Sequence, residues 1–213
     1  MQARSQTAGE EIANSAVHGV GLLAALIMAP LLIVAAVRHS TTGGIVGAGI
    51  FCGTMVLVFL SSMLYHMVRE GRFRQHLLKA DHGAIYLFIA GSYTPFALRA
   101  AHDHPLAWYL LALVWSVALG GVILRACGRL THPLWSTGFY LLMGWLVLIA
   151  AYPLASHLAA NSVAWLVAGG VAYTVGVVFF LTDARVRFGH AVWHGFVLLG
   201  CACHYTAVWA GTY

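Results

Sequence analysis

Charged residues are so few and so unevenly placed in this chain that they limit the folds open to it. The 213 residues include 11 Lys and Arg and 6 Asp and Glu, and 61% of the side chains are apolar. Soluble domains carry about 25% charged residues, against 8% here. The composition therefore predicts an integral membrane protein and argues against a disordered chain, a nucleic-acid-binding protein and a soluble enzyme. Six long stretches contain no charged residue: 12–37, 39–68, 82–98, 104–124, 130–182 and 188–213.

The lengths of these stretches predict seven transmembrane helices. A helix needs about 20 apolar residues to cross a bilayer, so five stretches hold one span each. The stretch 130–182 holds two spans, because a proline and a polar cluster interrupt it near Tyr152-Pro153 and Asn161-Ser162. We expect a single all-α membrane domain over residues 1–213, with spans at roughly 14–37, 45–66, 81–98, 105–124, 134–155, 162–182 and 190–212.

The basic residues predict how the bundle is oriented. With seven spans, nine Lys and Arg fall on one membrane face and only Arg38 and Arg99 fall on the other. The positive-inside rule places the N-terminus in the cytoplasm and the C-terminus outside. We expect a multi-pass protein of the plasma or inner membrane whose basic face meets anionic lipid headgroups. The nine are assigned to the N-terminus and to loops between spans: Arg4, Arg69, Arg72, Arg74, Lys79, Arg125, Arg129, Arg185 and Arg187.

Histidine is unusually frequent, with 12 copies, and ionisable side chains inside a membrane indicate function. His190 and His194 are four residues apart, so they share one helix face and could bind one metal ion. His66 ends the second span, which the predicted topology brings to the same membrane face as the start of the seventh. Three protein ligands with one open position are typical of catalytic zinc, although imidazole also suits iron and manganese. The expectation is one zinc ion per chain.

Other polar residues fall at the same predicted depth. Asp81 opens the third span and is expected either to hold a water molecule at the metal or to act as a base, while Ser62 could donate to that water or to a substrate carbonyl. Glu11, Asn14 and His18 share one face at the start of the first span. A ligating histidine needs an acceptor for its second ring nitrogen, which Glu11, Asn14 or Asp81 could provide.

Two further features lie deeper in the predicted bundle. His204 follows His194 by ten residues, which is about 15 Å along a helix, so it cannot share the metal site. We interpret it as a buried polar group that could line a substrate cavity. The segment Gly91-Ser92-Tyr93-Thr94-Pro95 predicts either a kink at the proline or a cavity wall.

The motifs stand in a fixed order along the chain. They are Glu11-x-x-Asn14-x-x-x-His18-x-x-Gly21, Ser61-Ser62-x-x-Tyr65-His66, Asp81-His82, Gly91-Ser92-Tyr93-Thr94-Pro95, and His190-x-x-x-His194 followed by His204. As a set they resemble the haemolysin III family, the bacterial branch of the progestin and adipoQ receptor family, which includes the adiponectin receptors and is related to alkaline ceramidases. The resemblance implies seven helices with a cytoplasmic N-terminus.

The resemblance also implies site residues. It implies zinc held by His66, His190 and His194, with Asp81 and Ser62 as the aspartate and serine of the site. Tyr65 and His82 adjoin these residues in the motifs and are expected around them.

The resulting functional expectation is a zinc-dependent hydrolase of lipid amides or esters that takes part in membrane-lipid homeostasis, with a fatty acyl chain lying between the helices. A non-catalytic sensor of the membrane state with structural zinc is the main alternative. A pore-forming cytolysin is less expected, because a water-filled pore needs polar residues along whole helices, whereas here they crowd at one membrane face. A retinal protein is excluded, because the single lysine, Lys79, lies outside the predicted spans.

Overall fold

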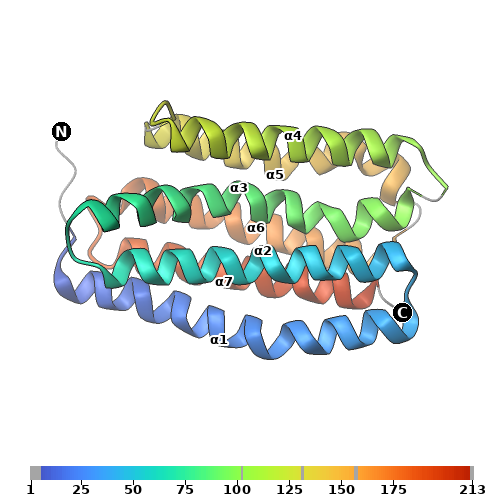
Figure 1. Cartoon of the computed structure of the whole chain (residues 1–213), viewed down its shortest axis with the longest axis horizontal. Helices are drawn as coiled ribbons and strands as arrows, with labels where there is room; N and C mark the ends of the chain where they lie inside the picture. The colour runs from blue at the N-terminus through green and yellow to red at the C-terminus, as the bar shows by residue number, and fades with distance from the viewer. Residues whose placement is uncertain (1–5, 102, 131, 156–157, 212–213) are drawn as a thin grey trace.

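The computed structural model describes residues 6–101, 103–130, 132–155 and 158–211. Within these residues the chain forms seven α-helices and no strand, which confirms the all-helical prediction. The helices lie side by side along the long axis of the molecule (Figure 1). Arg4 and Thr212, which the sequence predictions used, lie outside the described residues. The helices are α1 (Ala8–His39), α2 (Thr42–Met67), α3 (Arg72–Ala100), α4 (Leu106–Ala126), α5 (Pro133–Ala155), α6 (Ala160–Thr182) and α7 (Gly189–Ala210).

Two helices begin at least six residues before the predicted spans. Helix α1 starts at Ala8 and α3 starts at Arg72, whereas the predicted spans start at residues 14 and 81. The assignment of Arg72, Arg74, Lys79 and Arg125 to loops is therefore wrong. The first three belong to the first turns of α3, and Arg125 belongs to the last turn of α4. The prediction ended each span at a charged residue, but a helix can continue past the membrane boundary. Lys79 donates a hydrogen bond to the Ala126 carbonyl at the end of α4 (2.7 Å), where a cation is favourable.

We call the two ends of the bundle the site end and the far end. The site end contains the starts of α1, α3, α5 and α7 and the ends of α2, α4 and α6. Helix α1 begins there with a capping box, in which the Thr7 side chain accepts from the Glu10 N–H and the Glu10 side chain accepts from the Thr7 N–H. The Glu10 carboxylate also accepts from the backbone N–H of Phe188 (3.0 Å). One buried carboxylate thus joins the starts of α1 and α7.

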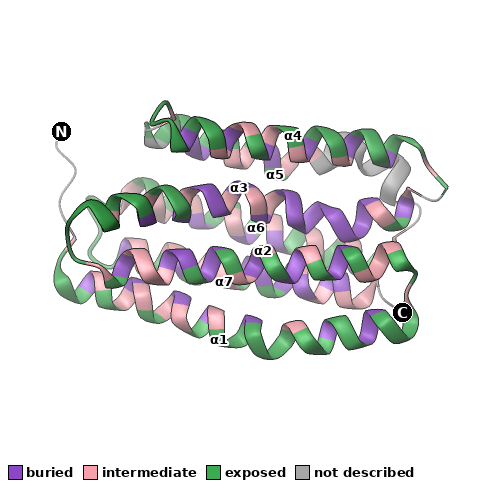
Figure 2. Ribbon diagram, in the orientation of Figure 1, coloured by how far each residue is buried: buried purple, intermediate pink, exposed green. Residues whose placement is uncertain are grey.

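Helix α3 is the central element of the bundle. It packs against α2, α4, α5 and α7, and after its exposed first turns its ribbon is coloured mainly as buried in Figure 2. It belongs to both apolar cores, contributing Phe88 to the core shared with α1, α2 and α7 and Tyr86 to the core shared with α4 and α5. This enclosed position explains why α3 tolerates polar residues, since it contacts protein on several sides rather than lipid.

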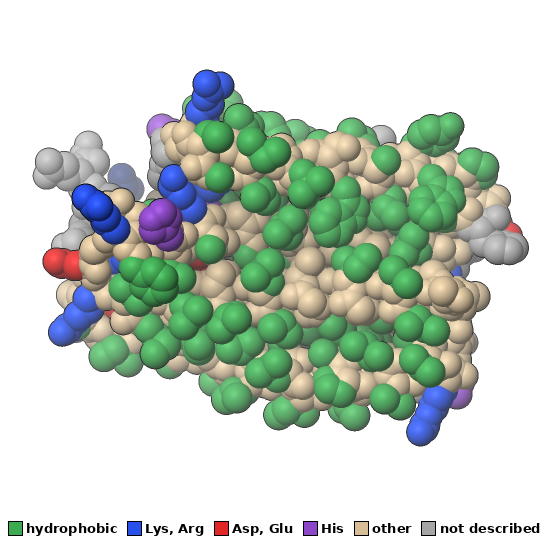
Figure 3. Space-filling view, viewed as in Figure 1, with side chains coloured by type: hydrophobic (Ala, Val, Ile, Leu, Met, Phe, Trp, Pro, Cys, Tyr) green, Lys and Arg blue, Asp and Glu red, His purple; other side chains and the backbone are tan. Residues whose placement is uncertain are grey.

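The outer surface is apolar over the length of the bundle. Large hydrophobic side chains such as Ile12, Leu23 and Tyr109 are exposed, and Figure 3 shows such side chains over most of one face, with basic side chains gathered at the site end. Five of the described helices, α1, α2, α4, α6 and α7, are long and apolar enough to cross a membrane. The crossing by α3 and α5 and the orientation of the bundle stay predictions.

Candidate metal site

Three histidines from two helices meet at the site end. His66 lies in the last turn of α2, and His190 and His194 lie in the first turns of α7. One nitrogen of each ring lies within 4.8 Å of the others, and the Nε2 atoms of His66 and His194 are 3.1 Å apart. Two nitrogens bound to the same tetrahedral zinc ion at 2.0–2.1 Å are about 3.3 Å apart. The spacing of the rings is therefore close to what one ion requires.

Carboxylates orient two of these rings. His66 Nδ1 lies 2.6 Å from Glu11 Oε2, and His190 Nδ1 lies 2.9 Å from Asp183 Oδ2. A carboxylate only accepts, so each Nδ1 carries the proton and donates it, which leaves Nε2 as the free lone pair. Carboxylate acceptors of this kind accompany histidines that bind metal. The residues present thus fit a metal ion by donor type and spacing, and His66 and His190 also fit it by tautomer.

Arg74 connects this arrangement to the start of α3. Its guanidinium pairs with Glu11 Oε1 (2.5 Å) and lies over the Tyr65 ring, 4.5 Å from the ring centroid. The Tyr65 ring in turn meets the His66 ring edge-on, with centroids 4.7 Å apart. Arg74 also donates to the Val68 carbonyl at the end of α2. Glu11 therefore holds both a ligand histidine and a cation, and it joins α1, α2 and α3.

Helix α1 covers the histidines from one side. The His18 ring packs on the His194 ring, with centroids 3.7 Å apart, and Asn14 Nδ2 lies 3.4 Å from His66 Nδ1. Both nitrogens of His18 and Nδ1 of His194 are buried without a hydrogen-bond partner among the described residues. Buried polar atoms are nearly always paired, so unpaired nitrogens concentrated here mark a binding site rather than an inert core.

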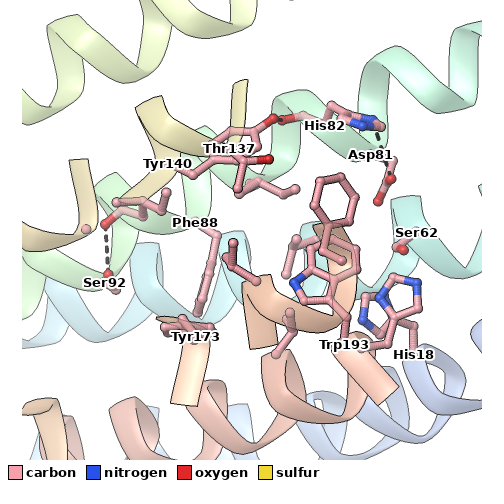
Figure 4. A pocket seen from close by; sticks show the side chains of 18 of the residues that line it. His18, Ser62, Asp81, His82, Phe88, Ser92, Thr137, Tyr140, Tyr173 and Trp193 are labelled. Atoms are coloured by element: carbon pink, nitrogen blue, oxygen red, sulfur yellow. Dashed lines mark hydrogen bonds and ion pairs between the residues drawn. The ribbon is translucent and has the colours of Figure 1, made fainter. Parts of the chain in front are cut away.

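Asp81 and Ser62 lie together beside the histidines. Both are buried, and Figure 4 shows them facing each other from α3 and α2. Asp81 does not belong to the group of ligand atoms within 4.8 Å, which contains His66, His190 and His194 among the described histidines, cysteines and acidic residues. His82 donates from Nδ1 to the Leu78 carbonyl (2.8 Å) and lies 3.6 Å from Asp81. The expected neighbour His82 therefore borders Asp81 rather than the three histidines.

A cavity of about 1230 Å³ connects these residues to the far end. The three histidines, Asp81 and Ser62 line its site end, and Leu158 and Val163 line it near the start of α6. Between them the wall is mainly apolar and aromatic, with Phe88, Tyr173 and Trp193 around the space in Figure 4. Helix α3 continues through Pro95, and Ser92 and Tyr93 of the same segment line the cavity, as the cavity-wall interpretation expected.

Sequence reasoning missed Asp183 and Arg74 as parts of this site. Asp183 stands in the connection between α6 and α7, and Arg74 was counted only as a basic residue of a loop. Its position in the sequence could have indicated Asp183, because it is the acidic residue nearest to His190 along the chain. Glu10 was missed as well, although the Thr-x-x-Glu pattern at Thr7 is typical of a helix start and could have indicated it.

Comparison with known proteins identifies the family. Residues 6–205 match the family described as haemolysin-III related. The chain is 38% identical over 208 residues to Hemolysin-3 of Bacillus cereus, covering 98% of this chain and 94% of that protein. It is 40% identical over 202 residues to the Hemolysin-3 homolog of Bacillus subtilis, covering 95% and 94%.

A human protein is also similar along nearly the whole chain. The monocyte to macrophage differentiation factor of Homo sapiens is 30% identical over 217 residues, covering 97% of this chain and 86% of that protein. The apolar helices and these relatives together show that the chain is a multi-pass membrane protein. This chain belongs to the haemolysin III family.

Proposed function

We propose that the chain is a zinc-dependent hydrolase that cleaves an amide or ester bond of a membrane lipid. The observation that carries the proposal is the common cavity: a three-histidine group with carboxylate partners shares one largely apolar space with Asp81 and Ser62. A purely structural metal site needs no such space. The proposed cellular role is in the turnover of membrane lipids.

His66, His190 and His194 would hold the ion, because one nitrogen of each ring lies within 4.8 Å of the others and carboxylates occupy the Nδ1 atoms of His66 and His190. A bound zinc ion would supply Lewis-acid chemistry, which activates water as a nucleophile and polarises a carbonyl. Asp81 accepts the proton of the attacking water and delivers it to the amine or alcohol that leaves. Ser62 donates a hydrogen bond to the carbonyl oxygen as negative charge develops on it.

The residues that line the cavity favour a lipid as substrate. Its walls beyond the three histidines are mainly apolar, which suits an acyl chain and gives little support to a water-filled pore. The basic side chains at the site end would attract anionic headgroups, and in the proposed orientation this end faces the cytoplasm.

The metal is the first point to test. We expect about one zinc ion per chain in the purified protein and none in the His190→Ala/His194→Ala variant. The matched control is His76→Ala/His132→Ala, which removes two exposed histidines from the same end of the bundle. Protein that is purified without chelators and binds no added zinc would contradict the proposal.

Turnover is the second point. Wild-type protein should release free fatty acid from a panel of lipid amides and esters, and Asp81→Asn should keep the zinc but lose the activity. An Asp81→Asn variant with full activity would refute the role of Asp81.

A structural zinc in a membrane sensor is the second candidate. The histidine group and its partners join α1, α2, α3, α6 and α7, so an ion there would also fasten the bundle. Bound zinc without any lipid product would favour this candidate over the hydrolase. Lysis of erythrocytes that persists in the metal-free histidine variant would instead favour the activity in the name of the Bacillus relatives.

A further inference from the structure

A second polar group lies in the same cavity, far from the histidines. His204 on α7 and Tyr173 on α6 both line the cavity, and their rings meet edge-on with centroids 5.3 Å apart. His204 is ten residues beyond His194, which corresponds to about 15 Å along the helix. Figure 4 shows Tyr173 at the opposite end of the space from Asp81 and His18. The function proposed above uses neither residue.

Each of the two rings packs closely against a glycine of the facing helix. The His204 ring lies against Gly169 of α6, and the Tyr173 ring lies against Gly200 of α7. A Cβ atom added at Gly169 or Gly200 would overlap the facing ring. Each helix therefore opens a space for the polar ring of the other, which is typical of close packing between helices in membranes. The packing against these glycines therefore fixes the positions of both rings.

The hydrogen bonds of the pair leave acceptors facing the cavity. His204 Nδ1 is buried without a hydrogen-bond partner among the described residues. In the neutral tautomer that carries its proton on Nε2, Nδ1 has a free lone pair. The Tyr173 hydroxyl donates its single proton to Cys201 Sγ (3.4 Å), so its oxygen also remains an acceptor.

From this we infer that the far half of the cavity binds a hydrogen-bond donor, a hydroxyl or an amide N–H carried along a lipid chain. An unpaired acceptor in an apolar wall is costly, and such a donor would satisfy His204 Nδ1, with Tyr173 Oη beside it. The ligand is thus a long-chain lipid with two polar groups about 15 Å apart. The inference deepens the proposed function and rests on it for the polar group at the histidines.

The test uses chain-length-matched fatty acids. Saturated fatty acids that carry one hydroxyl group at different positions, together with the unsubstituted acid, compete against a fluorescent fatty acid for the purified wild-type protein. One hydroxyl position should bind about 3–10-fold more tightly than the others, since a neutral hydrogen bond contributes about that much. His204→Phe keeps an aromatic ring against Gly169 but removes the Nδ1 acceptor. In this variant the preference should disappear while the unsubstituted acid binds as before.

The outcomes separate this inference from the proposed function. Fatty-acid binding without any positional preference in the wild type would overturn the inference, and so would a preference that survives in His204→Phe. The wild-type series alone decides if that variant does not fold. If His204 Nδ1 only binds a water molecule, the wild-type protein shows no positional preference, and this result overturns the inference. A positional preference in a protein with no hydrolytic activity would support the inference and contradict the hydrolase.

Discussion

Replacing Glu11 by Gln tests the arrangement on which the proposed metal site depends. Glu11 Oε2 accepts from His66 Nδ1 at 2.6 Å, and Oε1 pairs with Arg74 at 2.5 Å. Both neighbours are donors, and a carboxylate satisfies both. The amide of glutamine has one acceptor oxygen and one NH₂ donor, so one of the two neighbours would face another donor. The substitution keeps the shape of the side chain and removes one of its two interactions.

The size of the effect follows from the role of the carboxylate. Loss of the acceptor that orients a ligating histidine typically lowers metal affinity 10–100-fold. That factor corresponds to about 1.4–2.8 kcal/mol of binding free energy at 1.4 kcal/mol per tenfold. We expect zinc binding by Glu11→Gln to weaken by about this amount.

The assay is competition for zinc between the detergent-solubilised protein and a chromophoric chelator. The matched control is Glu70→Gln, which makes the same change of charge at an exposed position between α2 and α3. Glu70→Gln should bind zinc as the wild type does. If Glu11→Gln also binds zinc with wild-type affinity and unfolds at the wild-type temperature, the carboxylate does not orient a ligand and the reasoning fails.

Three other substitutions test further contacts. Asp183→Ala should also weaken zinc binding by about 10–100-fold in the chelator assay, because it removes the acceptor that orients His190 as Glu11 orients His66. Gly47→Ala should lower the free energy of unfolding by about 1–3 kcal/mol in thermal denaturation, since its Cβ would lie 2.6 Å from the α3 backbone, whereas Gly49→Ala meets nothing within 4 Å and should not. Glu10→Gln should cost about 1–3 kcal/mol in the same measurement, because the buried carboxylate accepts from the Thr7 N–H at the start of α1 and from the Phe188 N–H at the start of α7.

Most of the fold could be predicted from where charges are absent. The stretches without charge match the positions of the seven helices, because a bilayer-spanning helix excludes charge over a fixed length. The starts of α1 and α3 were missed for the same reason. A charged residue marks where the membrane boundary lies, and it does not mark where hydrogen bonding along the helix stops. Arg74 is helical although it is charged, and this helical extension lets it reach Glu11.

The candidate site could be predicted in outline. The four-residue spacing predicted that His190 and His194 share one helix face. The number of spans between them and His66 predicted that all three lie at the same end of the bundle, as they do in the structure. Ring orientation could not be predicted, because it depends on carboxylates from other segments. Asp183 reaches His190 through the turn between α6 and α7, where Phe188 adopts a left-handed conformation with φ of 60°. No local pattern in the sequence indicates that turn.

The neighbours Glu10 and Glu11 show how one helix start controls the site. Successive residues point about 100° apart on a helix, so the two carboxylates serve different partners. Glu11 faces His66 together with Asn14, while Glu10 caps α1 and accepts from the N–H of Phe188. The first turn of α1 therefore fixes both the ring of one ligand and the start of the helix that carries the other two. Because the same turn sets both, the geometry of the histidine group and the contact between α1 and α7 cannot vary independently.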